Sequence, residues 1–345
     1  MIRKLLLIAL CSCLLSCELN EPLYTTQSYV FGTLVDISIY GEPKPEAEMI
    51  ASGIMREFQV LNNRLHAWKP SELNGINRSI ANKESKSIKP DIAHIIQQAK
   101  KYSIQSDGLF NPAIGHLIST WGFQNDEFHP IEINNEKITA LVNSNPQMTD
   151  ISIDNGRLTS SNPSVKLDLG GYAKGYALDI AIQNLKKQAV SNTLINIGGN
   201  VIALGTHGEK PWRVGIQHPR KPSPIAALDL PSGWAIGTSG DYQRYFMLNG
   251  KRYCHIIDPR TGRPAQGTQS VTVLIPPQAN AGVLSDVASK PIFIADLSEK
   301  QKMAKKMGID NFMIIMDNGD ILISAPMLKR IEWLDVDAKK HVKVI

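Results

Sequence analysis

Six glycine-rich turns carry the polar side chains of this sequence that could do chemistry. Glycine lets the backbone come close to a ligand, and the N–H groups beside it can bind phosphate oxygens. In chain order the turns are Phe31-Gly32-Thr33, Asp107 to Pro112, Asp168 to Tyr176, Asn196 to Gly199, Thr238 to Tyr242, and His255 to Gly262. One such turn is ordinary, but six on one chain favour a ligand that carries phosphate groups.

The familiar catalytic and metal-binding motifs are absent from the sequence. The run from Gly170 to Gly175 has neither the G-x-G-x-x-G spacing of a dinucleotide site nor the G-K-[ST] ending of a P-loop. No H-E-x-x-H or C-x-x-C pair predicts a zinc site. Gly237 to Gly240 is one residue short of a G-x-S-x-G elbow. A triad of Ser239, His255 and Asp258 remains an alternative of the kind that any long chain offers.

Taken together, the turns resemble those of the FAD:protein FMN transferases, the ApbE-like family. The stretch D-L-G-G-x-A-K-G-Y from Asp168 and the later H-I-x-D-P-x-T-G from His255 carry a resemblance that spans about residues 28 to 325. The resemblance implies a protein that binds FAD and Mg²⁺ and transfers FMN to a Ser or Thr hydroxyl of an acceptor protein, releasing AMP. Some members of the family instead hydrolyse FAD to FMN and AMP.

The resemblance also implies roles for individual residues. His255 would be the general base that takes a proton from the acceptor hydroxyl, unless it is a strand histidine with a structural hydrogen bond. Trp68 would pack on a planar ring of the ligand, unless it is a core tryptophan, and Lys174 would neutralise a phosphate. The residues expected to contact FAD are Phe31, Trp68, Leu109, Phe110, Asn111, Asp168, Lys174 and Ile257. Asn111 stands where the family usually has Asp.

The metal site is where the sequence departs most from the family. The resemblance implies that Mg²⁺ is held by the carbonyl of Gly171, by Asp286 and by a Thr four residues later, but that position is Lys290. A hard cation takes oxygen ligands, and an ammonium donates hydrogen bonds without accepting any. Lys290 either supplies positive charge in place of the metal and holds the pyrophosphate, or forms an ordinary i,i+4 surface pair with Asp286. A non-catalytic or metal-independent FAD-binding protein therefore stays an alternative.

Apolar periodicity predicts the elements that must position these turns. Helices are expected at 46–66, 91–105, 171–188, 279–289 and 297–307. Strands are expected at 27–40, 149–160, 192–205, 212–217, 225–237, 242–247, 252–257 and 269–275, with a closing strand pair at 312–323. Strands and helices mix without a regular βαβ order, which predicts an α+β fold with a largely antiparallel sheet in one domain over 27–345.

Composition narrows the class of protein. With 345 residues, 43% of them apolar and 20% charged, the chain has the make-up of a globular protein, which excludes disordered, collagen-like and multi-span membrane classes. The 37 Lys and Arg and the 32 Asp and Glu are spread along the chain without a basic run. We therefore expect no nucleic-acid partner.

The N-terminal residues predict export. Two basic residues precede an apolar run from Leu5 to Leu15 that ends in Leu14-Leu15-Ser16-Cys17, which resembles a bacterial lipobox. We expect 1–16 to be a lipoprotein signal peptide, Cys17 to be lipidated, and 17–26 to tether a domain that faces the periplasm or the cell exterior; an ordinary secretory signal is the alternative. The mature domain would then keep only Cys254 as a free cysteine, so no disulfide is expected within the chain.

Overall fold

The described part of the chain, residues 22–125 and 127–345 of the computed structural model, is built around a nine-stranded sheet. Every neighbouring pair of its strands is antiparallel except the last, which is parallel. In spatial order the strands are β1 (Leu23–Val30), β2 (Thr33–Tyr40), β6 (Thr193–Ile197), β7 (Asn200–Leu204), β10 (Ala235–Gly240), β15 (Thr268–Ile275), β16 (Asn311–Met316), β17 (Ile321–Ile323) and β19 (Val342–Val344). The predicted α+β class with a mainly antiparallel sheet is confirmed.

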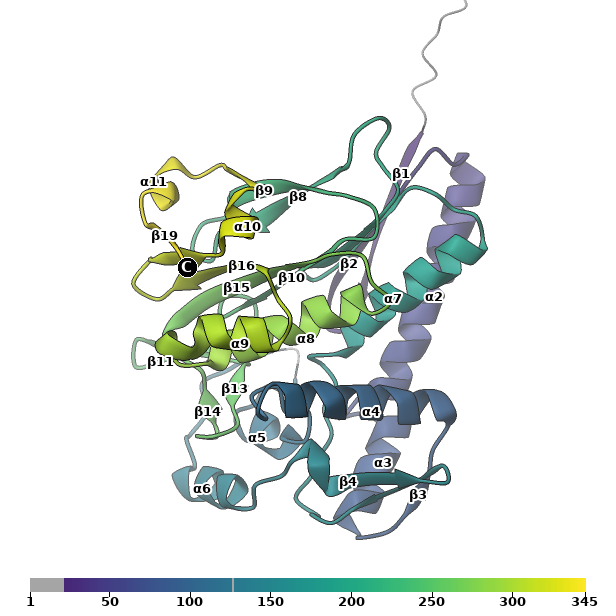
Figure 1. Cartoon of the computed structure of the whole chain (residues 1–345). Coiled ribbons are helices and arrows are strands. Elements are labelled where there is room, and N and C mark those ends of the chain that lie inside the picture. The colour runs from purple at the N-terminus through teal and green to yellow at the C-terminus, as the bar shows by residue number, and fades with distance from the viewer. Residues whose placement is uncertain (1–21, 126) are drawn as a thin grey trace, which may run out of the picture.

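Helices cover one face of this sheet and a smaller sheet covers the other (Figure 1). The helices are α7 (Ala173–Lys187), α8 (Ala281–Ile294) and α9 (Lys300–Lys306), whose apolar side chains share the main core with β10 and β15. The smaller sheet consists of β8 (Trp212–Gln217), β9 (Pro224–Leu230) and β18 (Ile331–Trp333). Burial alternates strictly along β8, as expected for a strand with one covered face, whereas β15 lies between two layers and is buried throughout.

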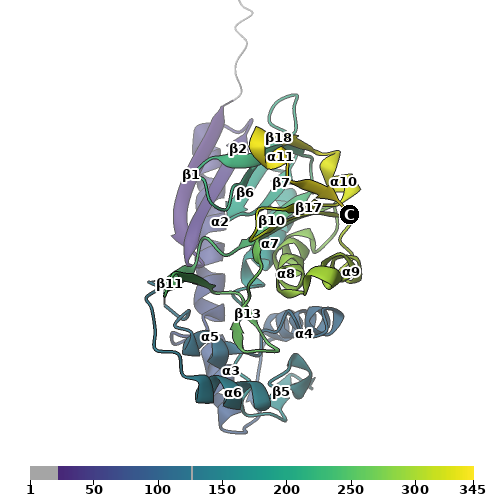
Figure 2. The same cartoon turned by 90° about the vertical axis from the view of Figure 1, so that its left-hand side faces the viewer.

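A second group of short elements lies at the far end of the long helix α2 (Lys44–Leu65), below the main sheet in Figure 2. Its members are α3 (Glu72–Ala81), α4 (Pro90–Gln105), α5 (Gly115–Thr120), α6 (Asn135–Asn143), β3 (Lys86–Ser87), β4 (Ile151–Asp154) and β5 (Arg157–Ser160). Two hairpins, β11 (Tyr245–Leu248) with β12 (Lys251–Cys254) and β13 (Ile257–Asp258) with β14 (Arg263–Pro264), connect this group to the sheet. The buried Trp121 donates its indole N–H to the carbonyl of Gly262 at 2.7 Å and thereby fixes the second hairpin.

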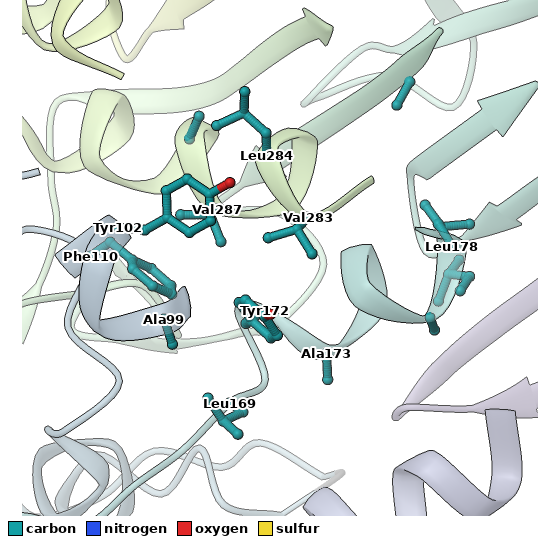
Figure 3. Close-up of a cluster of buried hydrophobic side chains, with 14 of the residues drawn as sticks. Ala99, Tyr102, Phe110, Leu169, Tyr172, Ala173, Leu178, Val283, Leu284 and Val287 are labelled. Atoms are coloured by element: carbon teal, nitrogen blue, oxygen red, sulfur yellow. The ribbon is translucent and has the colours of Figure 1, made fainter. Parts of the chain in front are cut away.

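The helices α7 and α8 touch through two glycines, and this contact shapes the region that carries the glycine-rich stretch. A Cβ on Gly175 would lie 2.3 Å from the carbonyl oxygen of Gly282, and a Cβ on Gly282 would lie 2.5 Å from that of Gly175. Only glycine allows backbones this close. One buried cluster surrounds this contact (Figure 3). It contains Tyr172 and Ala173 at the start of α7, Val283 and Val287 of α8, and side chains of α4.

The predicted helices are present, with shifted ends. Helix α8 continues to Ile294 although Pro291 lies in its last turn, and the helix expected at 297–307 divides into a 3₁₀ turn (Leu297–Glu299) and α9. The ranges 149–160, 27–40, 192–205, 225–237 and 252–257 each hold parts of two strands rather than one. In the first of these, Asn155 and Gly156 both have positive φ, which is the geometry of a tight hairpin turn.

The ends of the domain differ from the expectation. Strand β1 begins at Leu23, so residues 23–26 belong to an edge strand rather than to a tether, because they pair with the end of β2. The proposed signal peptide and Cys17 lie outside the described residues. Two short helices, α10 (Ala325–Leu328) and α11 (Val336–Lys339), lead to the last strand. No helix within the described residues has the length and apolar character needed to cross a membrane.

Candidate functional site

A cavity of about 650 Å³ opens between the sheet, the start of α7 and the second group of short elements. Its volume is in the usual range for small-molecule sites, about 300–1,000 Å³. It brings together all of the site residues predicted within the described chain, which are Phe31, Trp68, Leu109, Phe110, Asn111, Asp168, Gly171, Lys174, His255, Ile257, Asp286 and Lys290. The structure decides their placement, and their individual roles stay predictions.

One wall of the cavity is aromatic and apolar. Phe31 and Gly32 both have positive φ and make the tight turn between β1 and β2, which projects the Phe31 ring to 6.0 Å from that of Phe58. Trp68 follows the end of α2 and is half-buried, with the ammonium of Lys166 4.2 Å from its ring centre. Trp68 is therefore not a core tryptophan, and this wall offers rings on which a planar ligand can stack.

The hydrogen bonds of Asn111 give a physical reason for Asn rather than Asp at this position. The side-chain amide donates to the carbonyl of Pro146 at 2.9 Å, while its Oδ1 accepts the N–H of Ala113 at 3.0 Å. An aspartate could accept the second bond but could not make the first, because it has no N–H to donate. In this chain Asn111 therefore ties the cavity-lining segment from Leu109 to Pro112 to the loop at Pro146.

The glycine-rich stretch forms the start of α7. Asp168 accepts the N–H of Gly170 at 2.7 Å, which tightens the turn, and Lys174 reaches back to the carbonyl of Gly170 at 3.2 Å. The N-terminal residue Tyr172 provides no side-chain cap, so the first N–H groups of the helix need other partners. A helix start of this kind carries partial positive charge and favours an anion.

Asp286 provides one of those partners from α8. Its Oδ2 accepts the N–H of Gly175 at 3.2 Å, and its Oδ1 lies 2.6 Å from the ammonium of Lys290 and 3.5 Å from that of Lys174. Burial would raise the pKa of Asp286, but the two ammonium groups and these hydrogen bonds outweigh it and lower the pKa to about 2. The carboxylate is 1% exposed, so its pair with Lys290 is a buried one, and the expectation of an ordinary surface pair is wrong.

His255 lies in the same cavity. Its Nδ1 is 3.2 Å from the carbonyl of Arg244, which as an acceptor holds the ring in the tautomer with a proton on Nδ1 and leaves Nε2 free to accept one. Burial and the positive charges of Arg244, Lys174 and Lys290 lower the pKa of His255 to about 3, so the imidazole is neutral at physiological pH. The structural hydrogen bond and the proposed role as a base are compatible, because they use different nitrogens.

The alternative triad does not form in the structure. Ser239 shares a hydrogen bond with Ser289 at 2.7 Å, and Asp258 pairs with Arg260 at 2.8 Å. His255 instead bonds the carbonyl of Arg244. Each side chain of the hypothetical triad has a different partner, so serine hydrolase chemistry has no support here.

Comparison with known proteins agrees with this geometry. The model of the ApbE family matches residues 31–313. The chain belongs to the ApbE family. The FAD:protein FMN transferase of Rhodobacter capsulatus is 39% identical over 308 residues, 89% of this chain, although the chain spans only 58% of that relative's length. The FAD:protein FMN transferase of Haemophilus influenzae is 26% identical over 96% of this chain and 98% of its own. The crystal structure of the ApbE protein of Thermotoga maritima superimposes with a TM-score of 0.81 at 29% identity, over 90% of this chain and 99% of that one.

The residues around Asp286 do not fit the Mg²⁺ ion that an ApbE-like sequence implies. The ammonium of Lys290 lies against the carboxylate oxygen that would bind the ion, and also donates to the carbonyl of Asp286 at 2.6 Å. The Lys290 stem crosses Gly171 so closely that a Cβ there would lie 2.7 Å from it. Among the described residues no group of three or more His, Cys, Asp or Glu side chains is placed to hold a metal ion.

The sequence did not predict two residues that line the cavity, Arg244 and Gln124. Arg244 lies over the Phe128 ring at 5.1 Å and donates to the carbonyl of Phe123 at 3.3 Å. Its Nε and the Oε1 of Gln124 are buried and have no hydrogen-bond partner within the described part of the chain. Both residues line the cavity, so a ligand can supply the missing partners. The only signal in the sequence is that Arg244 lies two residues after the end of one of the six turns.

Proposed function

We propose that this protein is an FAD:protein FMN transferase that cleaves FAD and attaches FMN to a Ser or Thr hydroxyl of an acceptor protein. The observation that carries the proposal is the composition of the cavity described above. Its aromatic wall with Phe31 and Trp68 suits the flavin, and its charged floor with Lys174 and Lys290 suits the two phosphates. The names of the relatives and the match to the ApbE family support the same reaction.

In this reaction the acceptor hydroxyl oxygen attacks the phosphorus on the flavin side of FAD. The bond between that phosphorus and the bridging oxygen breaks, and AMP leaves with the bridging oxygen and its electron pair. The hydroxyl proton passes to Nε2 of His255, which is free and neutral. The ammonium groups of Lys174 and Lys290 stabilise the charge that develops on the phosphate oxygens.

The decisive experiment supplies the protein with FAD and an acceptor domain that carries a Ser or Thr target. Equal amounts of AMP and covalently bound FMN are expected. AMP with free FMN and no labelled acceptor would identify an FAD pyrophosphatase, and bound FAD without AMP would identify a non-catalytic FAD-binding protein. The variant His255→Gln should slow transfer by roughly 10²–10⁴-fold, the usual contribution of a general base, while leaving FAD affinity unchanged.

We also propose that the protein is a membrane-anchored lipoprotein that acts outside the cytoplasm. The lipobox at Leu14 to Cys17 supports this, because it predicts acylation of Cys17. The variant Cys17→Ser should lose its acyl label and fractionate away from membranes. Membrane association that is unchanged in this variant would contradict the anchor and leave the transferase proposal intact.

A further inference from the structure

The floor of the cavity, formed by Lys174, Lys290 and Asp286, holds more positive than negative charge. Two ammonium groups, those of Lys174 and Lys290, share the single carboxylate of Asp286. The carboxylate is 1% exposed, whereas the two lysine side chains are 20% and 17% exposed and both line the cavity. The negative partner is therefore hidden behind the two cations, and the ligand meets their positive charge.

Both ammonium groups keep hydrogen-bonding capacity. An ammonium has three N–H donors and no acceptor. Lys290 uses two of its donors, on the carbonyl and the Oδ1 of Asp286, and Lys174 uses one on the carbonyl of Gly170. The remaining donors are available to a ligand that brings oxygen acceptors. A pyrophosphate carries two negative charges and several such oxygens, so it matches this floor in both charge and hydrogen bonding.

Packing against Gly171 and hydrogen bonds to Asp286 fix the position of the Lys290 side chain. Its stem lies on the bare backbone of Gly171, where a Cβ would come within 2.7 Å of it. Its ammonium is held by two oxygens of one residue at 2.6 Å. A divalent ion bound by oxygens at about 2.1 Å would have to occupy the same space beside Asp286. The two cations exclude each other.

We propose that Lys290, positioned by Asp286 and Gly171 and acting with Lys174, takes the place of a divalent metal ion, so that this protein binds the pyrophosphate of FAD and transfers FMN without Mg²⁺. The inference rests on the proposed function, since it concerns how the same site holds its substrate. The bonds that form and break are those of the transfer reaction given above, and the lysines donate hydrogen bonds without losing a proton. Lys290 is then a catalytic residue that touches the substrate.

The first test measures FAD affinity by calorimetry and AMP release by chromatography, using the full-length protein in detergent with either EDTA or Mg²⁺. The affinity and the rate are expected to agree within about twofold between the two conditions, because the charge that a metal would supply is already present. FAD binding or AMP release that occurs only with Mg²⁺ would overturn the inference and leave the proposed function standing. No binding and no AMP in either condition would overturn both.

A second test changes the residue itself. Lys290→Thr replaces the ammonium with an oxygen, so FAD affinity in EDTA should fall roughly tenfold to a hundredfold, the scale of a lost charge-assisted hydrogen bond. Mg²⁺ should restore much of this affinity, and should raise the melting temperature of the FAD-free variant but not of the wild type. Lys302→Met is the matched control, since Lys302 is a 78% exposed lysine on α9 and its loss should change neither quantity. Wild-type affinity for Lys290→Thr in EDTA would contradict the inference, and the melting curve reports whether the variant is folded.

Discussion

Two buried aspartates, Asp179 on α7 and Asp286 on α8, both accept backbone N–H groups at the start of a helix, but among the described residues only Asp286 has positively charged neighbours. Asp179 accepts the N–H groups of Gly282 and Val283 at 2.7 and 2.8 Å, at the start of α8. Asp286 accepts the N–H of Gly175 at 3.2 Å, at the start of α7. Each helix therefore supplies a carboxylate that satisfies the other's free N–H groups, on either side of the contact between Gly175 and Gly282.

The charges around the two carboxylates differ completely. Burial raises the pKa of Asp179 to about 7, and the two backbone hydrogen bonds only partly oppose it. Asp286 is buried as well, but the positive charges of Lys174 and Lys290 outweigh the effect of burial and lower its pKa to about 2. The cause is position, because Asp286 lies against the cavity and Asp179 does not line it. Asp179 caps the start of α8 without any cation from the described part of the chain. Asp286 also holds Lys174 and Lys290 in place, and these lysines supply the positive charge that an anionic ligand needs.

The largest effect is expected from Asp286→Asn. Without the carboxylate, two partly buried ammonium groups lose their shared counter-charge, which should cost about 3 kcal/mol of the free energy of unfolding. Added FAD should recover part of this loss, because its phosphates replace the missing negative charge. Urea denaturation with and without FAD measures both. A variant as stable as the wild type would show that the lysines do not depend on Asp286.

The next largest effect is expected from Gly175→Ala, which disturbs both carboxylates at once. The new Cβ would meet the backbone of Gly282 and Val283 at 2.3 to 2.7 Å, so the helices must separate. We expect a loss of about 2 kcal/mol, typical of overpacking, together with weaker FAD binding. Gly75→Ala in α3 is the control, because a Cβ there has no neighbour within 4 Å, and it should gain roughly 0.5–1 kcal/mol from helix propensity. Equal behaviour of the two variants would remove the glycine contact from the explanation.

A smaller effect is expected from Asp179→Asn. The amide keeps one acceptor for the start of α8 but turns an N–H donor toward the other backbone N–H, so one hydrogen bond is lost, at about 1 kcal/mol. No positive side chain is left without a partner, which is why the loss should be smaller than that of Asp286→Asn. Urea denaturation at pH 5 measures it, and FAD affinity should stay unchanged because Asp179 does not line the cavity. A loss larger than that of Asp286→Asn would reverse the comparison.

The contrast between the two aspartates marks the limit of what the sequence could predict. Alternation of apolar residues and the missing βαβ order were enough for the fold class. The glycine turns pointed to most of the cavity residues, but Trp68, Asp286 and Lys290 lie outside the six turns and came only from the resemblance to the ApbE-like family. The sequence did not predict that Asp286 and Lys290 are buried, because their spacing of four residues is the same on a surface helix. It also did not single out Asp179 or Arg244, whose surroundings come from segments that are distant along the chain. Gly175 and Gly282 meet only when α7 packs on α8.

The last prediction concerns how stability depends on pH. Asp179 titrates at about 7 in the folded protein and near 3.8 when unfolded, so between these values the folded state keeps a proton that the unfolded state has lost. Its contribution to stability is therefore complete below pH 3.8 and is lost as the pH rises through about 7.

Asp286 has the opposite sign: its folded pKa is about 2 against 3.8, so its contribution is present above pH 3.8 and is lost as the pH falls through about 2. The gap between a pKa of about 7 and one of 3.8 corresponds to about 4 kcal/mol, more than the hydrogen bond lost in Asp179→Asn, so the advantage of the wild type over this variant in free energy of unfolding should fall from pH 4 to pH 7 and reverse its sign. The difference from Asp286→Asn should be constant over that range and shrink only in stronger acid. Denaturation curves at a series of pH values measure both differences, and parallel profiles for the two variants would mean that the aspartates share one electrostatic environment after all.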